Sequence, residues 1–254
     1  MKLKKQIQST GLLGIWFINF ICLVFSCTIK ANNLLEKIDG KIVIIKSVNQ
    51  LKCEHLVNPL GIDIANPRLS WVLQDTSQSV RGSSQTGYQI IVARSLKMLN
   101  KNNGDLWDTG KIISNLTNGI SYTGKSLKSN QILYWKVRVW DQYGNVSEWS
   151  DVNQWTMGIL NAQDWSGASW ISSPDSMSKK DNSTFLLRRD FSIKRGLKRA
   201  ILSICGLGQY EMSFNGKTIT ESILNPGWTQ YDKTCLYDTY DVTSLLQEGQ
   251  NAAG

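Results

Sequence analysis

The sequence has 254 residues and a formal net charge of +8 at pH 7, with 28 Lys and Arg against 20 Asp and Glu. Residues 1–31 carry four of the lysines and no acid, so removing them reduces the charge from +8 to +4, and the remaining charges of both signs are interspersed. This pattern is typical of a solvated surface and argues against a nucleic-acid partner. The 10 tryptophans, the many β-branched and aromatic runs and the scarcity of helix-favouring runs predict an all-β protein.

The first 31 residues have the features of an export signal. Three lysines among the first five residues precede an apolar stretch at residues 11–25, which is shorter than the roughly 20 residues that a transmembrane helix needs. Three outcomes remain open for this segment: cleavage at Ala31, lipidation of Cys27 after a loose bacterial lipobox, and retention as a membrane anchor. The segment therefore predicts an exported protein, periplasmic or on the outer membrane or cell surface of a bacterium.

The next residues divide into a linker and a first domain. Residues 32–47 show no clear pattern, and we predict a linker there. Residues 48–160 contain about seven short strand-like segments separated by turn signals, which predicts a fibronectin type III or immunoglobulin-like β-sandwich. No pair of cysteines spans the predicted sheets, which favours the fibronectin type.

The clearest strand lies within Leu133–Trp149. Trp135, Val137 and Val139 fall on one face by period two, and the polar or amphipathic side chains between them fall on the other. Such alternation is typical of a strand with one face in a core and one in water. Asp141 and the residues after it carry turn chemistry.

A second β-domain is predicted for residues 164–254. Its signals are four strands, an Asn-Gly hairpin turn, an extended segment and a helical turn capped by Thr243, and another strand is expected where the chain reaches residues 251–254. The predicted elements fall at 185–193, 199–206, 210–214, 217–223, 237–241 and 243–246. They do not close a sandwich or jelly roll, so this domain is expected to be incomplete and the chain to be the front part of a longer protein.

Side chains that commonly carry chemistry are isolated in this sequence. No motif for a nucleophile, a phosphate loop or a metal-spaced cluster occurs, and no metal or other cofactor is expected. The aspartates closest to predicted turns and strand ends are explained by capping and turn roles. Cys205 and Cys235 lie on neighbouring segments, where a disulfide and two free thiols both remain open.

An ordered set of motifs resembles the N-terminal part of bacterial α-L-rhamnosidases, glycoside hydrolases of family 78. In the first domain the motifs are NPLGID (58–63), PRLSW (67–71), LWDTG (106–110) and YWKVRVWD (134–141). In the second they are Trp165 with Trp170-Ile171, LGQY (207–210), NG (215–216), PGWT (226–229) with Tyr231, and YDVT (240–243).

The resemblance implies an enzyme that removes terminal α-L-rhamnose from plant glycans or glycosides with inversion. In the family the two catalytic acids lie in a downstream (α/α)₆ barrel, which these residues do not include. We therefore assign no catalytic residue here and predict that the fragment is inactive without the C-terminal catalytic domain of the same protein. The alternative is a non-catalytic surface glycan-binding or adhesion module.

Contact with a rhamnose-containing glycan is the remaining functional hypothesis. Trp228 and Tyr231 occupy a predicted loop with Asn225, and flat aromatic faces beside amide and hydroxyl groups suit pyranose rings. The alternative is that Trp228 packs over the sandwich at a corner.

Overall fold

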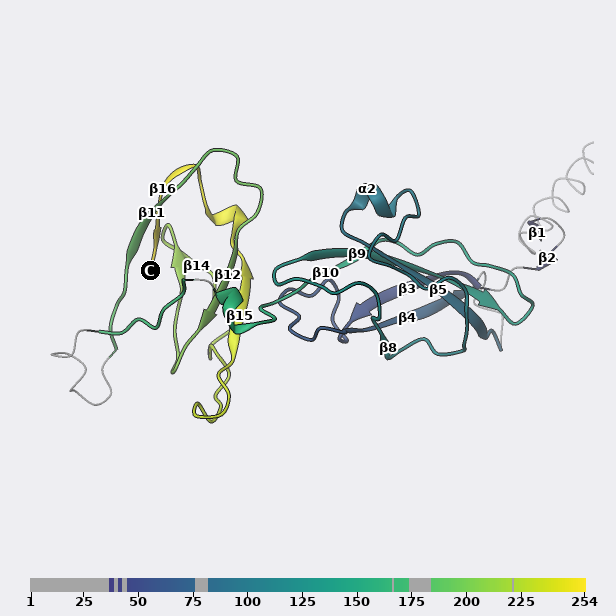
Figure 1. Cartoon of the computed structure of the whole chain (residues 1–254), viewed down its shortest axis with the longest axis horizontal. Helices are drawn as coiled ribbons and strands as arrows, with labels where there is room; N and C mark the ends of the chain where they lie inside the picture. Colours follow the sequence, from purple (N-terminus) through teal and green to yellow (C-terminus); the bar gives the residue numbers. More distant parts are fainter. Residues whose placement is uncertain are drawn as a thin grey trace, which may run out of the picture.

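The computed structural model describes residues 37–38, 41–42, 45–75, 82–165, 167–173, 184–220 and 222–254. These residues form two lobes of antiparallel strands joined near residue 160 (Figure 1). Helix among them is limited to one four-residue segment and two 3-10 segments. The all-β prediction is confirmed. The predicted export signal, including Cys27, lies outside the described residues.

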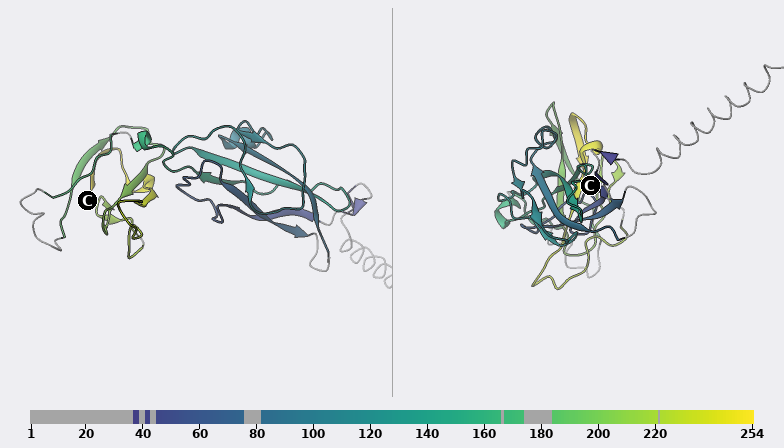
Figure 2. Two further views of the ribbon diagram at one scale, coloured as in Figure 1. Left: turned by 60° about the horizontal axis from the view of Figure 1, so that its bottom comes forward. Right: turned by 90° about the vertical axis from the view of Figure 1, so that its right-hand side faces the viewer.

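The first lobe is an immunoglobulin-like sandwich, as predicted. One sheet has the order β3-β4-β8, and the other has the order β10-β9-β5-β6 with β7 paired to β5. The two sheets lie face to face (Figure 2). The bounds are β3 Ile45–Cys53, β4 Arg68–Asp75, β5 Gln85–Ala93, β6 Trp107–Asp108, β7 Ile112–Ile113, β8 Ile120–Ser121, β9 Ile132–Asp141 and β10 Asn153–Thr156.

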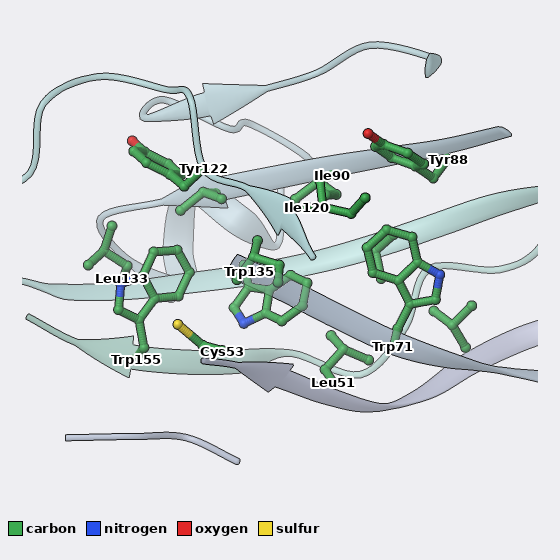
Figure 3. Close-up of a cluster of buried hydrophobic side chains, with 14 of the residues drawn as sticks. Leu51, Cys53, Trp71, Tyr88, Ile90, Ile120, Tyr122, Leu133, Trp135 and Trp155 are labelled. Atoms are coloured by element: carbon green, nitrogen blue, oxygen red, sulfur yellow. The ribbon is translucent and has the colours of Figure 1, made fainter. Parts of the chain in front are cut away.

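The alternation predicted for β9 is confirmed by burial. Trp135, Val137 and Val139 are all buried between the two sheets. The Trp155 ring stands edge-on to Trp135 at 6.5 Å and to Tyr122 at 6.1 Å between ring centroids. Figure 3 shows these three rings in one core. Aromatic burial across both sheets therefore holds the sandwich together.

The opposite face of β9 carries a stack of alternating cations and indole rings. The Arg138 guanidinium carbon lies 5.4 Å from the Trp140 ring centroid and 4.7 Å from that of Trp149. The Lys136 amine lies 5.1 Å from Trp149, and the Lys111 amine lies 4.7 Å from Trp140. The aliphatic stems and ring faces cover this side of the sheet, and the amine of Lys136, a buried residue, donates to the Asn102 side chain at 2.7 Å.

The predicted linker at 32–47 is too long. β3 begins inside it at Ile45, which is buried, and a two-stranded hairpin of β1 (Lys37–Ile38) and β2 (Lys41–Ile42) also lies there. The sequence pattern failed because the register of β3 against β4 shifts twice, and Gln50 has a positive φ of 47°. Such irregularities break the period-two alternation by which a strand is recognised.

A short helix covers part of the outer face of β5. α2 (Leu96–Leu99) begins after Ser95, whose side chain accepts a hydrogen bond from the Met98 N–H. Its Leu99 is buried together with Ile91 and Ala93. Both faces of β5 are therefore buried over this length.

The second lobe contains two small sheets. One has the order β11-β16-β13-β14, and the other pairs β12 with β15. The bounds are β11 Arg189–Ile193, β12 Ile201–Cys205, β13 Ser213–Phe214, β14 Lys217–Thr218, β15 Tyr237–Asp241 and β16 Gly249–Ala253, with 3-10 helices η1 Ala162–Trp165 and η2 Thr243–Leu245. Asn215 and Gly216 both have positive φ, 52° and 79°, as the predicted hairpin turn requires.

Several details of this lobe differ from the prediction. The strands expected at 210–214 and 217–223 shorten to Ser213–Phe214 and Lys217–Thr218. β11 begins four residues later than expected, at Arg189, because its partner β16 ends at Ala253, with which Arg189 pairs. Thr243 is not the cap of the helical turn. Val242 holds that position without a side-chain cap, and the Thr243 hydroxyl instead donates to Asp241 at 2.6 Å and accepts from the Ala200 N–H at 2.9 Å.

Candidate functional site

The two lobes meet at a close contact around Tyr237. The Ile159 N–H, at the end of the first lobe, donates to the Tyr237 hydroxyl at 2.9 Å. The ring of Trp165 stands edge-on to Tyr237, 5.3 Å between centroids. A Cβ on Gly158 would lie 2.4 Å from the same hydroxyl, so the approach requires glycine. The two lobes are therefore in close contact at this junction.

A charged contact supports the same junction. Arg199 of the second lobe donates to the Thr156 hydroxyl at 3.0 Å and forms an ion pair with Asp241 at 3.3 Å. Burial by itself would raise the pKa of Asp241, but hydrogen bonds from Thr243 and the Arg199 pair lower it below its ordinary value. Asp241 is therefore held as a carboxylate.

A cleft of about 740 Å³ lies beside the junction, with walls from both lobes. The first lobe contributes only the loop at residues 60–61, and the second contributes β15 and the segments on either side of it. The lining residues are Leu60, Gly61, Thr218, Ile219, Ser222, Asn225, Tyr237, Asp238, Thr239, Tyr240, Asp241, Ser244 and Leu245. They are mainly hydroxyl, amide and carboxylate side chains with two tyrosines, and none is Lys, Arg or His.

A tyrosine–aspartate cluster fixes one wall of the cleft. The Tyr210 hydroxyl donates to Asp238 at 2.6 Å and lies 3.4 Å from the Tyr240 hydroxyl. Burial, and then the hydrogen bond to Asp238, raises the pKa of Tyr210 above its ordinary value. Tyr210 thus stays protonated and holds one oxygen of the Asp238 carboxylate.

The structure does not bring the three predicted glycan contacts into one patch. Asn225 is buried, donates to the Ser222 carbonyl at 2.8 Å and lines the cleft. Trp228 is 89% exposed, which contradicts the alternative that it packs over the sandwich. Tyr231 is partly buried, and its carbonyl accepts a contact from the Cys235 thiol at 3.5 Å. Neither aromatic residue lines the cleft.

Sequence reasoning missed the cleft. The extended segment at 237–241 was predicted, but nothing in its pattern indicated that the loop at residues 60–61 would lie across from it. The only signal was the abundance of hydroxyl and carboxylate side chains between residues 218 and 244. A composition of this kind is also typical of ordinary surface loops.

Two other aspartates, Asp141 and Asp108, have structural roles. Asp141 accepts hydrogen bonds from the backbone N–H groups of Tyr143 and Asn145, at 2.9 and 2.8 Å, as a turn residue does. Asp108 accepts from Gln89 and from the Gly110 N–H. Within the described ranges, no group of three His, Cys, Asp or Glu side chains is placed to hold a metal ion.

Three cysteines in the described residues are free thiols. Cys53 is buried, and this burial, together with the Glu54 charge, raises its pKa to about 12. Cys205 and Cys235 are partly buried and unbridged, and burial and the neighbouring Cys235 raise the pKa of Cys205. Of the two alternatives left open by the sequence, the structure has the free thiols.

In the part of the chain that the structure describes, no helix has the length and apolar character needed to cross a bilayer.

Two family models match the two lobes. The one described as "Rha78A-like, N-terminal immunoglobulin domain" matches residues 48–161. The one described as "Alpha-L-rhamnosidase N-terminal domain" matches residues 195–254.

Individual proteins show the same similarity. A protein named Alpha-L-rhamnosidase from Alteromonas sp. is 38% identical over 208 residues, which cover 79% of this chain and 22% of the relative. One of the same name from Formosa agariphila is 37% identical over 208 residues, with coverage of 79% and 22%. The solved α-L-rhamnosidase from Dictyoglumus thermophilum superposes with a TM-score of 0.75 at 39% identity, over 84% of this chain and 25% of that one. The chain thus spans about a fifth to a quarter of the length of these proteins.

Proposed function

Because the chain belongs to the bacterial α-L-rhamnosidase family and carries two of its N-terminal domains, we propose that it is the non-catalytic front part of an exported rhamnosidase. The whole protein would hydrolyse terminal α-L-rhamnose from plant glycans or glycosides with inversion. The observation that carries this proposal is the match of both lobes, in order, to N-terminal domains of relatives, of whose length the aligned residues cover only 22%.

The carboxylates of this chain support a non-catalytic role. Inversion needs a carboxylic acid that protonates the leaving oxygen and a carboxylate that activates water, about 6.5–9.5 Å apart. A general acid needs a raised pKa. The pKa of Asp241 is lowered, and Asp238 already accepts the Tyr210 hydroxyl. We therefore propose that both catalytic acids come from a C-terminal catalytic domain of the same protein.

An activity assay tests this proposal. The purified chain is incubated with an aryl α-L-rhamnoside, and we expect no release of the aryl group above buffer. A characterised α-L-rhamnosidase provides the positive control. Release that disappears in Asp238→Asn or Asp241→Asn would show that the chain is itself catalytic and would refute the assignment. Reading the coding sequence beyond Gly254 tests the proposal that the catalytic acids come from a C-terminal domain. We expect it to encode a helical barrel with acidic residues on its inward loops.

Export and a lipid anchor at Cys27 form a separate part of the proposal. The charged and apolar halves of residues 1–31 support it. In a bacterial host, Cys27→Ala is expected to move the protein from the membrane to the soluble fraction, and Cys22→Ala serves as the matched control. Unchanged membrane association of Cys27→Ala would reject the lipid anchor and leave cleavage or retention of the segment.

A second candidate function is a surface glycan-binding or adhesion module. The exposure of Trp228, 89% in a polar loop, favours it, because a free indole face can stack on a sugar ring. A stop codon directly after Gly254, together with glycan binding that is lost in Trp228→Ala, would favour this function over the enzyme.

A further inference from the structure

We propose that the cleft at the lobe junction binds a neutral carbohydrate, and specifically a segment of a rhamnose-containing glycan. The choice of rhamnose rests on the proposed function. The assignment of a neutral, polyhydroxylated ligand does not, because it follows from the lining of the cleft alone.

The charge of the lining selects the class of ligand. Among the described residues that line the cleft, none is Lys, Arg or His, and two are aspartates. Phosphates, sulfates and nucleic acids would meet two carboxylates, of which Asp241 is paired with Arg199 and Asp238, within the described part of the chain, with no cation, and this is unfavourable at close range. A sugar is neutral, and its hydroxyl groups donate well to a carboxylate.

Several polar groups in the cleft are available to a ligand. Within the described residues, the hydroxyls of Thr239 and Ser244 and the second oxygen of Asp238 form no hydrogen bond, whereas the first oxygen of Asp238 accepts from Tyr210. Asp238 and Thr239 are consecutive in β15, so their side chains lie on opposite faces of the strand, and they offer sugar hydroxyls two separate polar contacts, an acceptor and a hydroxyl. The ring of Tyr240 in the lining supplies apolar surface for a sugar face, since the Tyr237 ring is already packed in the junction.

The size and rigidity of the cleft fit this use. Its volume of about 740 Å³ is within the roughly 300–1,000 Å³ of small-ligand sites. Its two walls come from different lobes, but a Cβ on Gly61 would lie only 2.8 Å from the Thr239 hydroxyl oxygen, so the walls are closely packed where they meet. A site already held in shape loses less conformational entropy when the ligand binds.

Calorimetric titration of the full chain with methyl α-L-rhamnoside and with a rhamnose-containing oligosaccharide tests the proposal. Thr239→Val keeps the shape of the side chain and removes its hydroxyl, and Asp238→Asn keeps an acceptor for Tyr210. We expect each to raise the Kd at least tenfold. Asp232→Asn, an exposed carboxylate outside the cleft, is the matched control and is expected to leave the Kd unchanged.

The outcomes separate the cleft from the other candidates. Binding that is lost in Trp228→Ala but kept in both cleft variants would place the glycan on the loop and overturn the proposal. Absence of binding to any neutral glycan would also overturn it. Binding of other neutral sugars but not of rhamnosides, with the same sensitivity to Thr239→Val, would confirm the cleft and count against the rhamnosidase assignment. Backbone amide shifts of residues 238–244 on titration of the unmodified chain give a readout that does not depend on how the variants fold.

Discussion

Replacing Gly158 with alanine should weaken the contact between the lobes. The added Cβ would lie 2.4 Å from the Tyr237 hydroxyl oxygen and 2.9 Å from the Gly61 carbonyl oxygen. An ordinary C–H···O contact is about 3.3–3.6 Å, so the closer of these is roughly 1 Å too short. Gly158 does not have a positive φ, so alanine at this position adds no backbone strain. The change in the free energy of unfolding therefore reports on the junction alone.

The size of the effect follows from what must move. Overpacking a close contact costs about 1–3 kcal/mol. If the Tyr237 ring moves away instead, the Ile159 N–H loses its acceptor, which costs about 1–3 kcal/mol for a buried group. Alanine also lowers the conformational entropy of the unfolded chain, which stabilises the folded state by about 0.4–1 kcal/mol. We therefore expect the free energy of unfolding to fall by about 1–3 kcal/mol.

Urea unfolding followed by circular dichroism measures this change, and a double-mutant cycle makes it specific. Tyr237→Phe removes the atom closest to the new Cβ, so Gly158→Ala should cost at least about 0.5 kcal/mol less in that background. Gly227→Ala is the control, because its Cβ would meet only the flexible end of Leu236, at 3.1 Å. Additive effects of the two changes at the junction would refute the described contact.

Three further changes test other parts of the first lobe. Trp149→Ala removes the ring that Arg138 and Lys136 contact. It should lower the free energy of unfolding in urea by about 2.5–3 kcal/mol, from about 0.5–1 kcal/mol for the Arg138 contact and about 2 kcal/mol for that of the buried Lys136. No change in stability would show that the stack contributes nothing. His55→Gly should raise the free energy of unfolding by about 1 kcal/mol, because His55 is exposed with a φ of 65°, where glycine has no steric penalty. A variant less stable than the unmodified chain would contradict this. Glu54→Gln should lower the free energy of unfolding at pH 7 by about 0.2–1 kcal/mol, because it removes the ion pair with Arg68. Since the hydrogen bond from Arg68 lowers the pKa of Glu54, this stabilisation is full above the ordinary value of 4.5 and is lost as the pH falls through the folded-state pKa; a difference that persists at pH 2 would contradict it.

The elements that could be predicted from the sequence are those with strong local signals. The alternation around Trp135 identified β9, because a strand between core and solvent has a period-two pattern wherever it lies. The extended segment at 237–241 coincides with β15, and Asn215-Gly216 marked the β13–β14 hairpin without any tertiary information. Local chemistry was sufficient in each case.

The parts that were missed depend on long-range contacts. β3 was placed too late because its bulges hide the alternation, and only its pairing with β4 reveals the strand. The cleft needs residues 60–61 beside residues 218–245, a placement set by the Tyr237 junction and not by any motif. The predicted glycan patch was split for the same reason, because Asn225 turns inward while Trp228 faces solvent.

The position of β16 has a consequence for folding during synthesis. β16 (Gly249–Ala253) lies between β11 and β13 in its sheet, although both precede it in the chain. The four-stranded sheet therefore cannot assemble on the ribosome until these last strand residues have left the exit tunnel. The first sandwich has its final strand, β10, almost a hundred residues earlier. The nascent second lobe thus emerges next to a neighbour that is already folded and that presents the Ile159 N–H to the incoming Tyr237.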